Sequence, residues 1–326
     1  MTSRYDQWIR KISLLAVKTD YVGSDAGVLS RDMGLDLSEF RIRFHISGAD
    51  VESPNSAVIR VYNLAAKTLI ALREHDRIIL SAGYESGNFG IVFRGSIKQF
   101  KIGRENATDS YLDIYASDGD VFYNQAVLNA SYSAGTTDLQ ILEAIGKLSE
   151  NGLDTGSLTA TAQATPSIRG TVLFGMARQA LRNITTYLDA GWSIQDGKLV
   201  ITDNTGYRDG EAVEINAATG LVGIPEQTDT GIKVSCLLNS KIRIGGRVKL
   251  NNAEITQLIQ QDQNAAPVIY NKYKGLYRLA PLSADGMYRV FSIEHDGDTR
   301  GQNWHTTLIC LAVNESVPAN QSVSGQ

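Results

Sequence analysis

The stretch Leu237–Leu250, LLNSKIRIGGRVKL, alternates apolar and basic side chains on both sides of a Gly-Gly pair. A two-residue hairpin turn at Gly245-Gly246 would set Ile244 opposite Arg247 and mix both side-chain types on each face. The alternation instead stays in phase through the glycines, which indicates one strand that bends there, as in a barrel or a curved sheet. The alternative is a strand limited to Arg247–Leu250, with the glycines closing a preceding loop. Both alternatives make the stretch architectural, and in the bent strand Lys241, Arg243, Arg247 and Lys249 form a basic outer side.

The composition is that of a soluble globular protein. The chain has 326 residues, of which 43% are hydrophobic and 20% charged, and this length suits two or three domains. A net charge of −4 gives no general attraction to nucleic acid or anionic membranes, so any basic function must be local. The only apolar run near the start, ISLLAV at 12–17, is too short to span a bilayer and poorly shaped for a signal peptide. We therefore expect no membrane insertion and retention in the compartment of synthesis.

Residues 1–125 are dominated by alternating runs typical of strands. In FRIRFHI, at 40–46, every second residue is apolar, and similar runs cover 77–85, 91–100 and 111–117. One helical segment, LAAKTLIALREHD at 64–76, lies between them. Antiparallel pairing with short loops predicts a small β-barrel or sandwich for this zone.

Residues 126–210 change period and predict an α+β insert. Thr137 to Gln140 form a capping box ahead of a helix. A longer helix carrying Val172, Met176, Ala180, Ile184 and Leu188 is expected to stop near Gly191. The two short runs after it join at Asp196-Gly197, a strong hairpin signal.

Residues 211–313 return to alternation of period two, and the runs at 287–295 and 304–313 predict a final hairpin. Cys236 and Cys310 both fall on apolar phases and are expected as buried free thiols, which fits a reducing compartment. The polar residues 314–326 are predicted to be disordered. The predicted fold class is thus mainly β, with two β-barrel domains, 1–125 and 211–313, flanking the small α+β domain.

No constellation of residues predicts a catalytic, metal or cofactor site. His295 and His305 could face each other across the final hairpin beside Asp296 and Asp298, but their spacing is not that of metal ligands. DGDTRG at 296–301 begins like a calcium loop and lacks its later ligands. Common hydrolase, nucleotide and zinc motifs are missing. We expect no metal and no cofactor.

Asp118 and Asp120, in SDGDVFYN, could form a carboxylate pair for acid and base catalysis on a sugar. The preferred interpretation is that they begin a short turn or helix, where carboxylates accept hydrogen bonds from free amides. The basic outer side, together with Arg41 and Arg43, could contact phosphates, but no aromatic stacking platforms accompany it. A charged surface for a protein partner is the better hypothesis, with no specific nucleic-acid sequence as ligand.

The order of these features resembles the baseplate hub family of contractile-tailed bacteriophages and prophages. The resemblance rests on LSEFRIRFHISG at 37–48, AVIRVYNLAAKTLIAL at 57–72, RIILSAGYESGNFGIVFRGSI at 77–97, GWSIQDGKLVI at 191–201 and, above all, LVGIPEQTDTGIKVSCLLNSKIRIGGRVKL at 221–250. It extends over about 37–313 and includes no catalytic signature.

The resemblance implies a homotrimer in which each chain contributes two domains similar to the tail-tube protein, so that three chains present a pseudo-sixfold ring. Such a ring would join the hexameric tail tube to the trimeric central spike and contact other baseplate proteins. The chain would be a structural part of the virion's tail, assembled in the bacterial cytoplasm, and not an enzyme. The basic side chains Lys241, Arg243, Arg247 and Lys249 would then face a neighbouring subunit, the spike or the lumen.

Two alternatives to the hub interpretation remain open. One is a tail-associated peptidoglycan hydrolase that uses Asp118 and Asp120, for which a zymogram on cell-wall material is the test. The other is a β protein that binds carbohydrate or nucleic acid, which salt-sensitive binding of a polymer would indicate.

Overall fold

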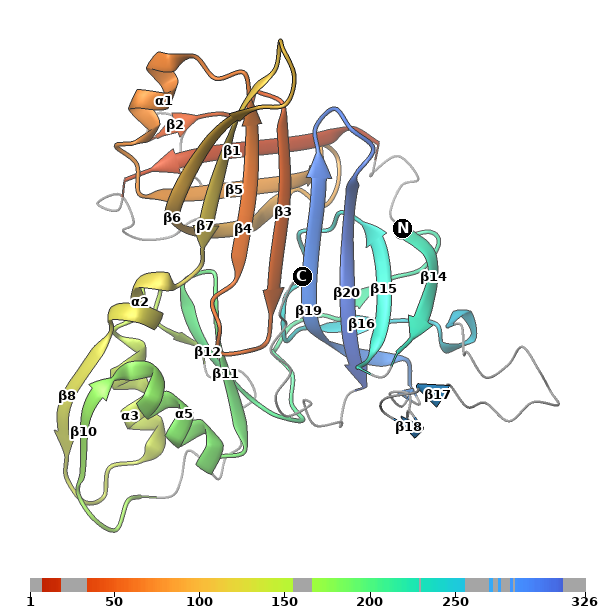
Figure 1. Cartoon of the computed structure of the whole chain (residues 1–326). Helices are drawn as coiled ribbons and strands as arrows, with labels where there is room; N and C mark the ends of the chain where they lie inside the picture. The colour runs from red at the N-terminus through yellow and green to blue at the C-terminus, as the bar shows by residue number, and fades with distance from the viewer. Residues whose placement is uncertain are drawn as a thin grey trace.

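The structure is a computed structural model of the chain, and it describes residues 8–18, 34–154, 166–228, 230–255, 270–271, 275–276, 282–283 and 285–312. The protein is mainly β, with one large, largely antiparallel sheet and a smaller α+β part below one end of it (Figure 1). None of the helices in the described part has the length and apolarity that crossing a membrane requires. The tail 314–326, predicted to be disordered, lies outside the described residues.

The large sheet follows one continuous path. In order, its strands are β14 (Leu221–Gln227), β15 (Ile232–Leu237), β20 (Trp304–Ala312), β19 (Met287–Asp298), β3 (Ile42–Ala49), β4 (Ser56–Tyr62), β7 (Ser110–Ser117), β6 (Gly90–Arg104), β5 (Arg77–Tyr84), β1 (Arg10–Val17) and β2 (Leu35–Asp36). Two short strands lie off this path: β13 (Val213–Glu214) pairs with β16 (Arg247–Lys249), and β16 also pairs with β19.

The first and third zones of the sequence meet at the pairing of β3 with β19, which we call the seam. Along it Phe44 lies opposite Gly297 and Ile46 opposite His295. The described strands form one open sheet and close no barrel, so the two predicted β-barrel domains are not confirmed. Alternation gives each strand a buried face, but it does not specify which strand an edge will pair with.

A fold-over of the sheet creates the first core. Strands β1 and β5 cross behind β3, β4 and β7 (Figure 1), and β6, which is 15 residues long, passes from β5 to β7. The register shifts between Leu80 and Ser81 and between Ile97 and Gln99, and such bulges let strands bend around a corner. Helix α1 (Ala66–Leu72) confirms the predicted helical segment.

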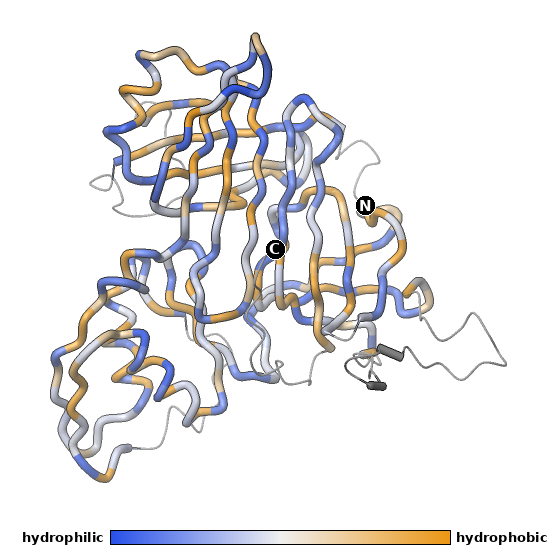
Figure 2. Tube along the Cα trace, viewed as in Figure 1, coloured by the Kyte–Doolittle hydropathy of each residue, from blue (hydrophilic) through white to orange (hydrophobic). Residues whose placement is uncertain are grey.

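Alternating hydropathy along the strands (Figure 2) produces two apolar clusters in the sheet. One is built around Phe44, Ile59, Leu80 and Ile114, and the other around residues of β15, β16, β19 and β20. Trp304 of β20 belongs to the first cluster, where its ring meets that of Phe44 edge-on, with centroids 5.6 Å apart. The final hairpin therefore contributes to both clusters.

The α+β part, called the insert (residues 120–203), has its own core. Its elements are α2 (Asp120–Gln125), β8 (Val127–Tyr132), α3 (Asp138–Gly146), β9 (Leu153–Asp154), β10 (Thr171–Met176), α5 (Ala177–Tyr187), β11 (Ala190–Gln195) and β12 (Lys198–Asp203). The Thr137 to Gln140 capping box is present. The Asp196-Gly197 turn joins β11 to β12, with positive φ at both residues.

The predicted long helix from Val172 is wrong in its first part. Residues 171–176 form β10, which pairs with β8, and the helix begins only at Ala177. Val172 and Met176 are spaced four apart, which suits a helix face and also one face of a strand, so the apolar pattern alone did not separate the two. Among the remaining short elements are η3 (Asn252–Glu254), β17 (Tyr270–Asn271) and β18 (Gly275–Leu276).

Candidate functional site

The stretch that carries the predicted interface is mostly irregular. Strand β15 ends at Leu237, and only Arg247–Lys249 returns to a strand, so the loop alternative for the glycines is confirmed. Gly245 has φ 75°, a left-handed conformation that suits glycine. The apolar phase is nevertheless buried throughout, at Ile242, Ile244, Val248 and Leu250.

The four basic side chains of this stretch do not form one free face. Arg243 makes an ion pair with Asp196 at the tip of the β11–β12 hairpin, with Nη1 3.2 Å from Oδ2. Arg247 stacks over the Tyr207 ring at 4.3 Å and donates a 2.8 Å hydrogen bond to the Gly210 carbonyl. Lys241 and Lys249 are exposed. Of the four predicted interface residues, these two lysines are therefore the best placed to contact a partner.

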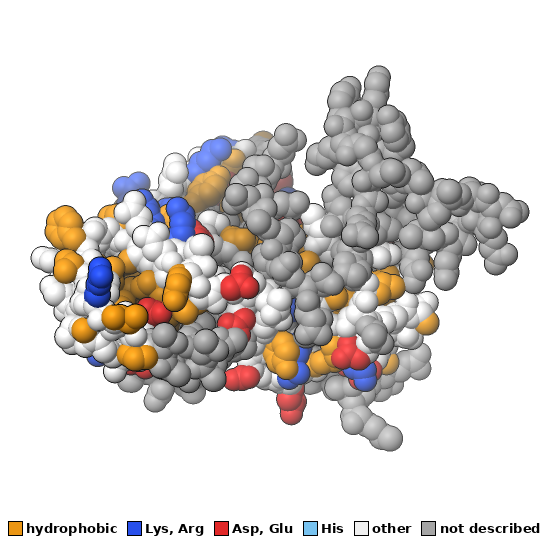
Figure 3. Space-filling view, turned by 90° about the horizontal axis from the view of Figure 1, so that it is seen from below, with side chains coloured by type: hydrophobic (Ala, Val, Ile, Leu, Met, Phe, Trp, Pro, Cys, Tyr) orange, Lys and Arg blue, Asp and Glu red, His pale blue; other side chains and the backbone are white. Residues whose placement is uncertain are grey.

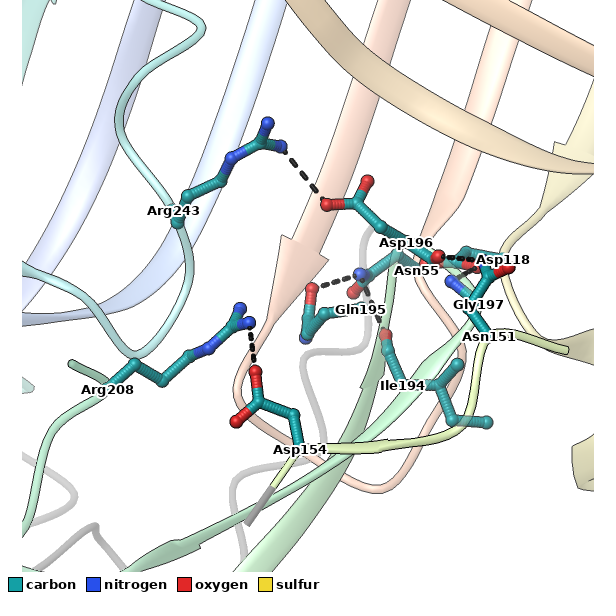
Figure 4. Close-up of polar contacts among 10 residues, drawn as sticks. All are labelled: Asn55, Asp118, Asn151, Asp154, Ile194, Gln195, Asp196, Gly197, Arg208 and Arg243. Atoms are coloured by element: carbon teal, nitrogen blue, oxygen red, sulfur yellow. Dashed lines mark hydrogen bonds and ion pairs between the residues drawn. The ribbon is translucent and has the colours of Figure 1, made fainter. Parts of the chain in front are cut away.

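Arg243 belongs instead to a polar junction between the insert and the sheet (Figure 4). Asn55, just before β4, donates to the Ile194 carbonyl at 3.2 Å and to Oε1 of Gln195 at 2.7 Å. Arg208 forms an ion pair with Asp154 at 2.7 Å. The junction thus ties the insert's three-stranded sheet to both halves of the large sheet.

Asp118 lies inside this junction and not in an open catalytic cleft. It is buried, and its Oδ1 accepts a 2.8 Å hydrogen bond from the Gly197 amide. Burial, and then the nearby Asp196 charge, raise the pKa of Asp118 to about 7, although amides of the turn oppose the shift. A cavity of about 50 Å³ adjoins it, lined also by Arg94, Arg243 and His295. That volume suits ordered water and is too small for a sugar ring.

Asp120 does not pair with Asp118. It is the first residue of α2, as the preferred interpretation predicted, and its Oδ1 accepts hydrogen bonds from Lys98 at 2.7 Å and Asn124 at 2.9 Å. The two carboxylates therefore have different partners. The arrangement that a glycoside hydrolase needs, two carboxyl groups flanking a substrate, is not what these residues form.

A buried charge pair anchors the chain as it leaves the insert. Arg289 of β19 pairs with Asp50, and both side chains are almost fully buried. The same guanidinium donates through Nη1 to the carbonyls of Asp203, Asn204 and Gly206 at 3.0–3.1 Å. Arginine's planar fork can serve several acceptors at once, so Arg289 fixes this connector on the sheet.

The histidines lie on opposite sides of the final hairpin. His295 is buried, hydrogen-bonded to Oγ1 of Thr306 at 2.8 Å, and burial lowers its pKa to about 4. His305 lies opposite Asp296 and points the other way, so the two histidines do not face each other across the hairpin. Asp296 instead lies between His45, at 2.8 Å, and His305, at 3.8 Å. Within the described residues no group of three or more His, Cys, Asp or Glu could hold a metal ion.

The outer face of the large sheet is polar and crosses the seam. Arg43 of β3 lies opposite Arg60 of β4, a like-charged pairing that is unfavourable unless one charge is compensated. Arg60 turns to Asp113, with two contacts of 2.6 and 2.9 Å, and stacks on Tyr111. With the His45 and Asp296 pair, these side chains make a broad charged face of the kind that contacts proteins or solvent.

Both cysteines are buried free thiols, as predicted. Burial raises the pKa of Cys236 to about 12 and that of Cys310 further. Neither thiol is positioned for chemistry, since reactive cysteines need a stabilised thiolate.

Exposed apolar side chains form a feature that the sequence did not reveal. Phe174 of β10 is 83% exposed, and Val127 and Val172 lie on the same outer side of the two-stranded β8–β10 ribbon. Figure 3 shows hydrophobic side chains distributed over the lower face of the insert. Val222 and Ile224 of β14 are exposed as well. The apolar character of these side chains alone predicted that they are buried. Only the pairing of their strands shows which face of each strand is exposed to solvent.

Comparison with known proteins gives one family match. Residues 60–259 match the model of the family described as baseplate hub gp41. No curated protein matches the chain by sequence. The matched range begins inside β4, at Arg60, and includes the whole insert and the stretch Leu237–Leu250.

Solved structures of similar fold include tail proteins and a component of a secretion system. The 43 kDa tail protein of prophage MuSo2 from Shewanella oneidensis aligns with a TM-score of 0.54 and 8% identity, over 94% of this chain and 99% of that one. A tail protein from Neisseria meningitidis gives 0.54 and 9%, over 93% and 96%. An Escherichia coli protein described as a component of the type VI secretion system, similar to the T4 tail proteins gp27 and gp5, gives 0.54 and 12%, over 85% and 74%. At these identities the likeness shows a shared fold.

Proposed function

The chain belongs to the baseplate hub gp41 family, and from that premise we propose that it is the trimeric adaptor between the hexameric tail tube and the trimeric central spike. Family membership makes it a structural component of a bacteriophage tail and not an enzyme. The adaptor role, the homotrimer, the contacts with other baseplate proteins and assembly in the host cytoplasm are the proposed part.

The observation that carries the proposal is the seam between β3 and β19. One chain already joins two β units edge to edge into a single sheet: strands β1 to β7 on one side of the seam, and strands β13 to β16 with β19 and β20 on the other. If each unit is equivalent to one tube subunit, as the predicted tube-like domains require, three chains supply six units. A contact that repeats the edge-to-edge geometry between chains would close the ring.

Two strand edges that have no partner among the described strands lie at opposite ends of the molecule and are suited to that contact (Figure 1). Among the described residues β14 pairs only with β15, and Ile224 on it is 65% exposed. Strand β6 leaves β5 after Ser96, so residues 98–104 pair only with β7, and Ile102 there is 56% exposed. Exposed apolar edge strands are hazards unless a partner covers them.

Crosslinking between these edges tests the ring. The Ile224→Cys/Ile102→Cys variant is expected to form disulfide-linked oligomers that stop at three chains, because a closed ring uses every edge. The native thiols do not interfere, since Cys236 and Cys310 are buried. The matched control, Ile224→Cys with Val172→Cys on the insert, should stay uncrosslinked. Ladders longer than three, or equal crosslinking in the control, would reject the ring.

The basic interface is proposed in a reduced form. Lys241 and Lys249 are exposed, whereas Arg243 and Arg247 are engaged within the chain. Lys241→Glu/Lys249→Glu should leave folding and ring formation intact but weaken binding of the tube or spike protein at least tenfold, measured by calorimetry. Arg73→Glu, a charge reversal on the opposite unit, is the control. Unchanged affinity for both partners would remove these lysines from the interface.

The alternative function, a peptidoglycan hydrolase, required Asp118 and Asp120 to act as a pair, and the structure does not pair them. Asp118 is buried against the β11–β12 turn, and Asp120 is bound to Lys98 and Asn124. No observation favours that activity for the described residues.

A further inference from the structure

The insert is an independently packed body. Its core includes Leu142, Leu181, Trp192 and Ile201, and none of its members belongs to either apolar cluster of the sheet in the described part of the chain. A unit that shares no core with its neighbour can move against it without losing its own packing.

Only two connectors join the insert to the sheet. The first contains Gly119, which has φ 67° and directly precedes α2. The second, residues 204–212, belongs to no helix or strand. Arg289 and the 2.8 Å bond from the Arg208 amide to the Gly245 carbonyl hold this second connector on the sheet. Pivots at Gly119 and at the end of β12 would therefore leave both anchors in place.

The β3–β4 turn forms a platform that contacts the insert through polar groups. Asp50 accepts a 3.0 Å hydrogen bond from the Ser193 hydroxyl, and Glu52 forms an ion pair with Arg182 of α5. Asn55 donates two hydrogen bonds to β11, at Ile194 and Gln195. If the platform and the insert separated, hydrogen bonds to water would replace these contacts, so their separation would not carry the large cost of exposing apolar surface.

Further polar contacts, apart from those of the β3–β4 turn, hold the tip of the β11–β12 hairpin. Asp118 accepts from the Gly197 amide, Arg243 pairs with Asp196, and Arg77 pairs with Glu150 (Figure 4 shows the first two). The Arg243 and Asp196 side chains remain 46% and 42% exposed. The adjoining cavity, about 50 Å³, brings water-sized space to the same place. A space large enough for water thus adjoins the bonds that would break if the hairpin moved.

We propose that the insert is a pivoting arm with two positions, docked and undocked, and that the polar junction around the β11–β12 hairpin is the catch that holds it docked. The arm swings on the connectors at Gly119 and at residues 204–212, with its own core intact. This mobility does not depend on the proposed adaptor role, and it gives a hub a part that can change position while the large sheet stays assembled.

Asn55→Asp tests the catch. The change keeps an oxygen to accept the Ala49 amide but removes both hydrogen bonds donated to β11. In hydrogen exchange of the full chain, the Gly197 amide at the hairpin tip, which donates across the junction to Asp118, should exchange at least tenfold faster, while amides of α3 stay unchanged. Arg243→Gln, at an exposed position that does not endanger folding, should give a smaller rise of roughly two- to fivefold. Asn129→Asp, the same chemical change at an exposed site of β8, is the control.

A distance measurement shows whether the arm moves as a body. Spin labels at Tyr187→Cys on the insert and Lys101→Cys on the sheet use exposed sites, and the native thiols are buried. Asn55→Asp should broaden the distance distribution or add a longer distance. The proposal is overturned if α3 and the hairpin exchange faster together, if the hairpin does not change in either variant, or if the distribution stays as narrow as in the control.

Discussion

At the residue scale, two buried titratable groups give the stability of the fold opposite dependences on pH. The pKa of Asp118 is raised to about 7 by burial and by Asp196, and that of His295 is lowered to about 4 by burial and by Arg243. As the pH rises from about 4 to 7, an unfolded chain releases the Asp118 proton while the folded chain retains it, so Asp118 destabilises the fold progressively. As the pH falls from 6.5 to about 4, an unfolded chain protonates His295 while the folded chain does not, so His295 destabilises the fold at the acid end.

Single substitutions should separate these two effects. Asp118→Asn keeps an acceptor for the Gly197 amide and should raise the free energy of unfolding above pH 7 by roughly 1 to 4 kcal/mol. In that variant the remaining His295 should make stability fall from pH 6.5 to 4. His295→Asn should show the reverse slope, with stability rising on acidification. Urea unfolding at several pH values measures both, and an unchanged slope in either variant would contradict the assignment.

The sequence predicted best which side chains of an alternating segment are buried. Ile242, Ile244, Val248 and Leu250 are buried although the segment is mostly loop. The roles of Arg243 and Asp118 were not predictable, because both depend on the β11–β12 hairpin, which lies far from them in sequence. Local patterns carry no information on such long-range contacts.

At the element scale, local signals succeeded where the chemistry is local. The Thr137 to Gln140 box, the Asp196-Gly197 turn and the final hairpin are present. The start of α5 was misplaced because β10 depends on pairing with β8, a contact between segments about 40 residues apart. Strand pairing of this kind overrides a helical spacing of apolar residues.

The β19–β20 hairpin should behave as a shared element of the two halves of the sheet. Trp304 is buried in the first core against Phe44, although its strand belongs to the other half. Trp304→Ala should lower the free energy of unfolding by about 3 to 5 kcal/mol, since it deletes a large core side chain. Chemical denaturation measures this, with exposed Trp8→Ala as the control. A loss below 1 kcal/mol would show that the seam is not supported by this contact.

At the scale of the whole molecule, the mainly β class and the α+β insert were predictable from the change of period along the chain. The single open sheet was not, because closure depends on which edges meet, and β3 and β19 are some 250 residues apart. Within the part of the chain that the structure describes, the edges at β14 and β6 are unpaired, and the proposed trimer would close its ring by contacts between chains at these edges.

The most direct test of this account is the mass and symmetry of the assembled chain, determined by light scattering followed by electron microscopy. We predict a particle of three chains with a threefold ring, formed either by the chain alone or on addition of the tail tube and spike proteins. A single-chain mass at every concentration, with and without those partners, would contradict the account.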